Sequence, residues 1–123
     1  MWKSFALVFF LIAMQPDAMA QTSGKGPNGG DVVVMEGHPI EFVTEGQEIT
    51  FYIVSEDKSP TPTAGATGRA VVQDGGKTVA VDLKPAEPNR LVGQLSAPLG
   101  ANARVVFAAK VEGHNLQARF THN

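Results

Sequence analysis

Short runs of alternating apolar and polar residues, each closed by a turn signal, recur from residue 31 to the end of the chain. The clearest run is the last one, where Leu116, Ala118 and Phe120 alternate with two polar residues. This alternation places every second side chain on one face of a β-strand. After residue 20, no window shows the 3.6-residue apolar period of an amphipathic helix. The chain therefore predicts an all-β fold.

Eight runs are expected to be strands, and segments rich in Gly, Pro, Asp and Asn separate them. Gly permits positive φ in such turns, and Pro fixes φ near about −65°. The runs are 31–36, 38–44, 48–55, 68–73, 78–83, 90–95, 103–111 and 116–121. Seven or eight short strands in a chain of this length are typical of a β-sandwich or a small barrel.

Of these two architectures, we favour a single immunoglobulin-like Greek-key β-sandwich over residues 31–123. The Cys…Trp…Cys pattern of true immunoglobulin domains is missing, so the term describes architecture alone. Strand alternation does not distinguish the sandwich from the barrel. The longest break between runs, at 58–67, is interpreted as a crossover loop between two sheets, with a binding loop as the alternative.

The first 20 residues have the organisation of a secretory signal peptide. Lys3 is followed by an apolar run at 5–14, by the breaker at 15–17 and by Ala18-Met19-Ala20. Ten apolar residues in a helix span only about half of a bilayer core, so a transmembrane anchor is not favoured. We expect cleavage before Gln21 and a flexible, glycine-rich lead-in at 21–30.

The absence of cysteine narrows the chemistry and the compartment. A chain with no Cys has no disulfide, no thiol nucleophile and no lipid-anchored cysteine at its mature end. Small exported eukaryotic domains more often carry disulfides or an N-x-Ser/Thr glycosylation sequence, and this chain has neither. The sequence therefore predicts a protein of the bacterial periplasm.

The charge pattern argues against nucleic acid and membrane surfaces as partners. Ten Lys and Arg stand against twelve Asp and Glu, for a net charge of −2. No basic stripe is present to neutralise a phosphate backbone, and no basic amphipathic helix marks membrane binding. After signal removal, no membrane insertion is expected.

Motifs of catalysis are also missing, so the chain is not expected to be an enzyme. Residues 24–29 match G-x-G-x-x-G, but a dinucleotide site needs a strand before the motif and a helix after it. No phosphate-binding loop and no G-x-S-x-G elbow occurs. Acidic pairs such as Glu56-Asp57 lie at expected turns, where such residues usually cap backbone N–H groups.

Three histidines are the candidate metal ligands. His114 is expected in the last turn and His122 at the end of the last strand, about 25 Å away along an extended chain, so one site cannot use both. His38 has Met35 and Glu36 across the Gly37 turn, and Asp31 one strand away. A Met thioether beside an imidazole suits Cu(I), and carboxylates would suit harder ions. The candidate metal ligands are therefore His38 and Met35. The alternative is that His38 is an ordinary surface histidine that binds no metal.

Several segments are similar to a known group of proteins. The match runs over about 26–121, and its pieces are Gly26-Pro27-Asn28-Gly29-Gly30, 32–36, 38–43, 49–53, 64–70, 85–93 and 117–120. Together they resemble small bacterial periplasmic proteins and the Gly-Pro-His-Gly-Gly-led β-domain of periplasmic adaptor (membrane fusion) subunits in heavy-metal efflux pumps. Asn28 stands where that pattern has histidine, so a metal role does not transfer to this position. His38 keeps its matching position.

The resemblance implies an exported periplasmic accessory or binding module linked to heavy-metal, copper-type efflux or homeostasis. It would bind a transition metal or dock to an envelope or efflux-complex protein, through a strand edge or the 58–67 loop. The alternative is a structural protein–protein interaction domain of the cell envelope with no small ligand.

Overall fold

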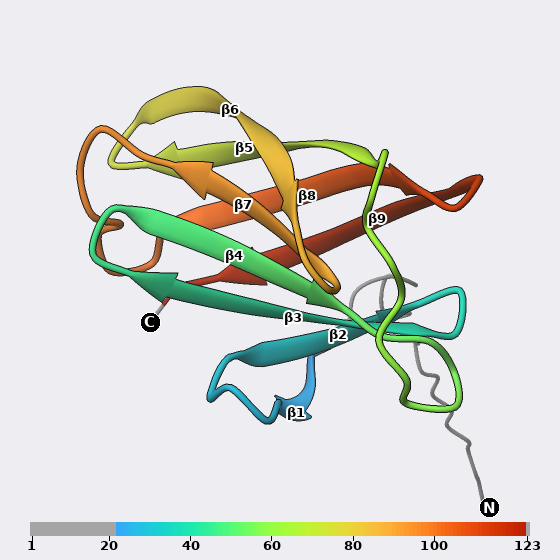
Figure 1. The fold of residues 1–123 in the computed structure, drawn as a ribbon. Helices are drawn as coiled ribbons and strands as arrows, with labels where there is room; N and C mark the ends of the chain where they lie inside the picture. The colour runs from blue at the N-terminus through green and yellow to red at the C-terminus, as the bar shows by residue number, and fades with distance from the viewer. Residues whose placement is uncertain (1–21, 123) are drawn as a thin grey trace, which may run out of the picture.

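The computed structural model describes residues 22–122, and this part of the chain consists of strands and connections without a helix. Accordingly, within these residues no helix is long and apolar enough to cross a membrane. The strands are β1 (Thr22–Lys25), β2 (Asp31–Met35), β3 (His38–Glu45), β4 (Glu48–Ile53), β5 (Thr67–Asp74), β6 (Lys77–Ala86), β7 (Arg90–Gln94), β8 (Arg104–Val111) and β9 (His114–Thr121) (Figure 1). The expected all-β fold is confirmed.

All nine strands belong to one curled antiparallel sheet, in the order β1-β2-β3-β4-β7-β6-β5-β8-β9. The sheet curls at β6, which pairs with β5 over residues 77–83 and with β7 over 84–86. As a result β1, β2, β3, β4 and β7 form a first half of the sheet, which faces a second half of β5, β8 and β9 (Figure 1).

The eight expected runs all form strands, but two expectations need correction. The described residues form nine strands, whereas seven or eight were expected. Residues 22–25, which were expected to belong to a flexible lead-in, form β1 at the sheet edge and pair with β2. The strand expected at 78–83 continues to Ala86, which is what lets β6 reach both halves. The expected signal peptide at 1–20 and its cleavage before Gln21 lie outside the described residues.

The core lies between the two halves and follows from the alternation along the strands. Phe51 on β4 is fully buried, and its ring centroid lies 5.3 Å from that of Phe42, 4.5 Å from that of Phe107 and 5.8 Å from that of Phe120. Two of these partners come from the second half, so the aromatic cluster joins the halves. Burial of aromatic side chains of this size dominates the stability of such a core.

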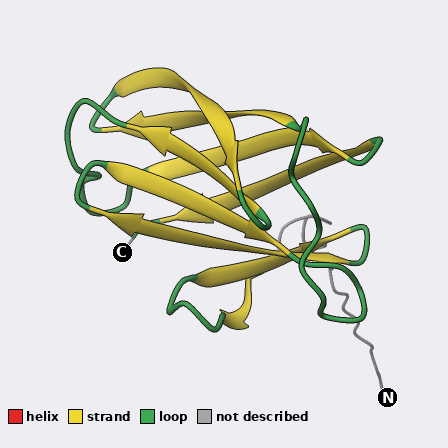
Figure 2. Ribbon diagram, in the orientation of Figure 1, coloured by secondary structure: helices red, strands yellow, loops and turns green. Residues whose placement is uncertain are grey.

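The connection between β4 and β5, residues 54–66, crosses from the first half to the second and covers one end of the core (Figure 2). Thr61 and Thr63 are each only 1% exposed. The Thr61 N–H donates to the Ile53 carbonyl at 3.0 Å, and the Thr63 hydroxyl donates to the Arg90 carbonyl at 3.0 Å. The segment predicted to cross between two sheets thus crosses between two halves of one curled sheet, and its buried threonines close the end of the core near the start of β3.

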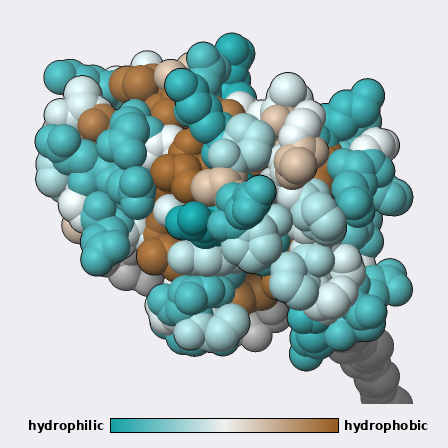
Figure 3. Space-filling model, in the orientation of Figure 1, coloured by the Kyte–Doolittle hydropathy of each residue, from teal (hydrophilic) through white to brown (hydrophobic). Residues whose placement is uncertain are grey.

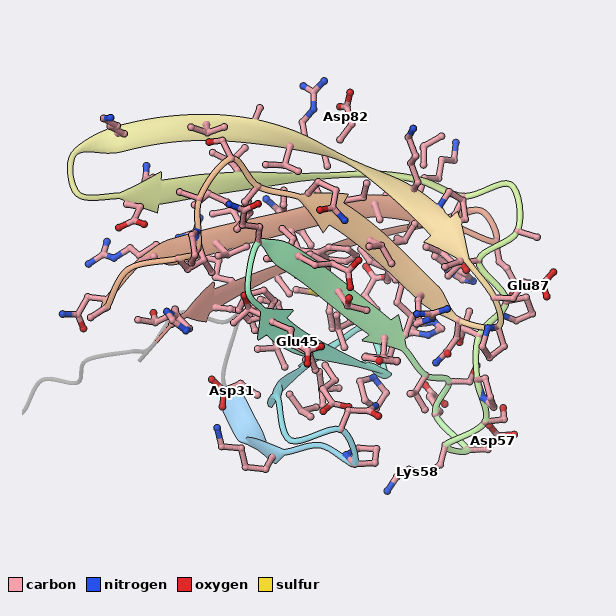
Figure 4. The ribbon with its side chains drawn as sticks, turned by 60° about the vertical axis from the view of Figure 1, so that its left-hand side comes forward. Asp31, Glu45, Asp57, Lys58, Asp82 and Glu87 are labelled. Atoms are coloured by element: carbon pink, nitrogen blue, oxygen red, sulfur yellow. The ribbon has the colours of Figure 1, made fainter. Side chains whose placement is uncertain are left out.

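Asp57 in this connection is fully exposed and carries a lowered pKa (Figure 4). The Ser59 hydroxyl donates to its Oδ1 at 2.6 Å, and the Ser59 backbone N–H donates to the same oxygen at 3.0 Å. Both bonds favour the charged carboxylate, which lowers its pKa. They therefore stabilise this turn when the pH is above the ordinary carboxyl pKa, and this stabilisation is lost as the pH falls through the lowered pKa of Asp57. We expect Ser59→Ala to raise the Asp57 pKa towards its ordinary value. An NMR pH titration of the Asp57 carboxyl checks this; an unchanged midpoint would contradict it.

Candidate functional site

Two hairpin turns of this fold have the same sequence, Glu-Gly-His, at residues 36–38 and 112–114. The two central residues have φ of 53° and 80° in the first turn, and of 50° and 82° in the second. Positive φ at both positions defines the tight type I′ hairpin, whose second position favours glycine. In each turn the histidine becomes the first residue of the outgoing strand, β3 or β9.

Strand alternation directs both histidines towards the space between the halves. His38 shares its face of β3 with buried Ile40 and Phe42, and His114 shares its face of β9 with buried Leu116 and Phe120. The two imidazole centroids are 5.5 Å apart, and the ring planes meet at 51°. One histidine comes from each half of the sheet, at the end of the core that the 54–66 connection covers.

A backbone carbonyl fixes the orientation of the His38 ring. Its Nδ1 lies 3.1 Å from the carbonyl oxygen of Val54. Because a carbonyl oxygen can only accept, Nδ1 must carry the hydrogen, and in the neutral ring Nε2 then holds the free lone pair. Histidines that bind metals almost always donate their other ring N–H in this way. This orientation leaves Nε2 as the ring nitrogen through which His38 could bind a metal, and metal binding itself stays a prediction.

Met35 lies directly across the turn from His38, because the register pairs these two residues. Directly paired residues of an antiparallel ladder project to the same face. Met35 is half-buried, and its side chain packs against the core. The structure thus brings the thioether and the imidazole of the predicted pair onto one face, while metal binding by them stays a prediction.

The other expected neighbours of His38 are placed differently. Asp31 stands at the far end of β2, where its carboxylate binds the Lys25 ammonium at 2.7 Å, so it does not join this site (Figure 4). His114, expected in the last turn and apart from His122, is the first residue of β9, and its ring centroid lies 5.5 Å from that of His38, an approach that the sequence did not predict. His122 lies at the opposite end of β9 as expected, with Nδ1 2.9 Å from the Gly100 carbonyl.

The donors at this site are two imidazoles and a thioether. Within residues 22–122, no three His, Asp or Glu side chains come together as a cation site. Glu56 lies over the first turn, since a Cβ on Gly37 would overlap its carboxyl group. Nitrogen and sulfur donors suit copper and zinc, whereas Mg²⁺ and Ca²⁺ need oxygen ligands. The residues present therefore fit a late transition metal.

The Gly26–Gly30 segment has a structural role in the fold. It wraps around the carboxylate of Glu41, which is only 3% exposed. This carboxylate accepts from the Asn28 N–H at 2.9 Å, from the Asn28 side-chain amide at 3.1 Å and from the Gly30 N–H at 2.8 Å. Asn28 stands where the resembled pattern has histidine. Its two hydrogen bonds to Glu41 hold the β1–β2 turn against β3.

We expect Glu41→Gln to destabilise the domain by about 2 kcal/mol. The glutamine oxygen can keep both backbone N–H groups only if its NH₂ group faces the Asn28 side-chain amide, and the bonds that remain lose their charged acceptor. Urea unfolding measures the difference. Glu45→Gln, at the exposed β3–β4 turn, is the control and should change stability by less than about 0.5 kcal/mol. Equal decreases in unfolding free energy for the two variants would show that the hydrogen bonds to the Glu41 carboxylate do not stabilise the domain.

A hollow of the described surface lies elsewhere, where β6 and β7 separate. It has a volume of about 790 Å³ and is lined mainly by β6, β7 and the 95–99 connection. Val79, at 50% exposed, contributes to its apolar wall. Apolar surface is visible on the face of the molecule that carries β4, β6 and β7 (Figure 3). None of Met35, His38 and His114 lines this hollow.

No family model, curated protein or solved structure matches the chain. The resemblance to the efflux adaptor β-domain accordingly stays a prediction from the motifs themselves.

Proposed function

We propose that this protein is an exported accessory module that binds a late transition-metal ion through His38 and His114. The observation that carries the proposal is the contact between these two rings, which come from opposite halves of the sheet. A metal–nitrogen distance of about 2.0–2.1 Å places the centroids of two imidazoles on one tetrahedral ion about 5 Å apart. The 5.5 Å between the centroids is close to that spacing.

The ligand roles follow from the surroundings of each group. His38 would bind through Nε2, because its Nδ1–H is held by the Val54 carbonyl. His114 would complete the pair from the second half, and Met35 would offer its thioether from beside His38. When bound, the ion would supply a link between these side chains, in keeping with storage or transfer of the metal.

The cellular setting of the proposal rests on the sequence. The signal-peptide pattern of residues 1–20 supports export, and the resemblance supports a periplasmic role in heavy-metal efflux or homeostasis beside an envelope or efflux-complex protein. We also interpret the curled sheet as an immunoglobulin-like Greek-key sandwich. In support, β5, β6 and β7 follow one another as neighbours, and β8 returns by a longer connection to lie beside β5.

Calorimetric titration of the purified protein with Cu(I), Cu(II), Zn(II) and Ni(II) tests the proposal. We expect one equivalent of at least one ion to bind tightly to the wild-type protein and to His122→Ala, whose ring lies at the other end of β9. Weak binding in the millimolar range for all four ions would overturn the proposal and leave a protein-interaction domain of the envelope as the function.

Met35 should decide which ion is preferred. Met35→Leu preserves volume and apolar character, so the core contact should survive with a stability change below about 1.5 kcal/mol. Because a thioether favours Cu(I) over Zn(II), we expect the affinity for Cu(I) to fall about 10-fold or more while the affinity for Zn(II) changes little. Competition titrations with a chelator of known affinity measure both constants. An equal change for the two ions would exclude sulfur from the site.

A further inference from the structure

Strand pairing joins the two halves of the sheet on one side only, and the connections 54–66 and 95–103 also link them along the chain. On that side, β6 pairs with both β5 and β7. On the other side, β2 and β9 lie close together. Within the described residues, however, the ladders of β2 run to β1 and β3, and the ladder of β9 runs to β8. No strand ladder closes the β2–β9 side of the described strands, here called the seam, and side chains pack across it.

The side chains across the seam differ between its two ends. At one end, the Phe42 and Phe120 ring centroids are 5.2 Å apart within the apolar core. At the other end the contact is the His38–His114 pair, and His114 is exposed to solvent. One half-buried and one exposed imidazole contribute less apolar burial than two buried phenyl rings, so this end of the seam has the weaker packing. Strand edges with few buried contacts open at a lower free energy than the core of a sheet.

We propose that the metal ion acts as a clasp that closes the histidine end of the seam. This inference rests on the proposed function, because the clasp is the same His38–His114 site. Each turn presents its histidine on a tight hairpin anchored in its own half. An ion can hold both rings only while the halves are together, so binding favours the closed seam over the open one.

The same linkage has a consequence for metal release. If the ion binds the closed state alone, closure strengthens metal binding by the same factor by which the ion favours closure. A partner that parts β9 from β2 would therefore release the ion without competing for its ligands. The fold thus couples metal occupancy to the freedom of one strand edge.

Amide hydrogen exchange of the full chain, with and without saturating Zn(II) or Cu(I), tests the clasp. At a free-metal concentration about 100 times Kd, opening of the seam should be suppressed by up to about 100-fold. We expect slower exchange in β9 and in the β2–β3 hairpin, and little change in the β5–β6 ladder, whose opening does not separate the histidines. His122→Ala should show the same pattern, and His114→Ala should lose it.

The outcomes separate the two proposals. Metal binding in calorimetry together with unchanged exchange at β9, or with an equal slowing in every strand, would overturn the clasp and leave metal binding intact. No binding in calorimetry, with no change in exchange at either ion, would overturn the proposed function and the clasp together. Because His114 is exposed, its alanine variant should fold, and apo exchange of that variant provides the reference for its own loaded form.

Discussion

Replacing His114 with alanine should lower the affinity for the bound transition metal by at least about 100-fold. Losing only a hydrogen-bond partner of a metal-binding histidine commonly costs 10- to 100-fold, so losing a direct ligand should cost more. The same loss is expected for His38→Ala, since the two rings form one site. Calorimetry, or competition with a chelator, measures the change.

The stability of the variants separates a ligand role from a structural role. His114 is exposed, so His114→Ala should unfold in urea within about 0.5 kcal/mol of the wild-type protein. The double variant should bind no more weakly than either single variant, because one remaining imidazole does not form the site. Retention of the wild-type affinity within a factor of three in His114→Ala would show that the ion binds elsewhere.

Replacing Gly30 with alanine should destabilise the domain by about 3 kcal/mol or more. A Cβ at this position would overlap the carbonyl oxygen of Phe42 and lie 2.9 Å from Cγ2 of Val43. The Phe42 carbonyl is part of the β2–β3 ladder and cannot move without disturbing the pairing of Asp31 with Phe42. The Gly30 N–H also donates to buried Glu41, so any shift would weaken that bond as well. Overpacking against backbone is among the larger effects of single substitutions.

Gly29→Ala is the matched control for this prediction. Gly29 precedes Gly30 in the same turn, has a φ of 83°, and has open space where a Cβ would be. Its alanine variant should therefore be destabilised only by the strain of the left-handed conformation, about 1 kcal/mol of unfolding free energy. Urea unfolding of the two variants gives the comparison. If Gly30→Ala lost no more than Gly29→Ala, the contact with Phe42 would not constrain the fold.

Local patterns were enough to predict most of the strands. Alternation at 116–120 and the glycine turns around it report on neighbouring residues, so they predict β9 and its hairpin with β8. The alternation did not predict β1, because Thr22–Lys25 has no apolar alternation and forms a strand through its pairing with β2. The curl depends on the length of β6 and on its two partners, which no local pattern encodes.

The candidate site was predictable only where its residues are close in the chain. Met35 and His38 are joined by a two-residue turn, so the Glu36-Gly37 sequence alone indicates that they face each other. The approach of His114 to His38 depends on how the two halves pack, which turn chemistry does not report. The repeated Glu-Gly-His sequence was the one signal in the chain that linked the two turns.

NMR of the imidazole nitrogens during a Zn(II) titration tests most directly whether His38 and His114 bind one ion. Long-range ¹H–¹⁵N spectra should show the Nε2 resonance of His38 and one ring nitrogen of His114 shifting together, with both changes complete at one equivalent. The His122 nitrogens should not change, because that ring lies at the opposite end of β9. If calorimetry shows that Zn(II) binds, unchanged His38 and His114 nitrogens at saturating Zn(II), or a response from only one of them, would contradict the two-histidine site; if only Cu(I) binds, the same titration is made with Cu(I).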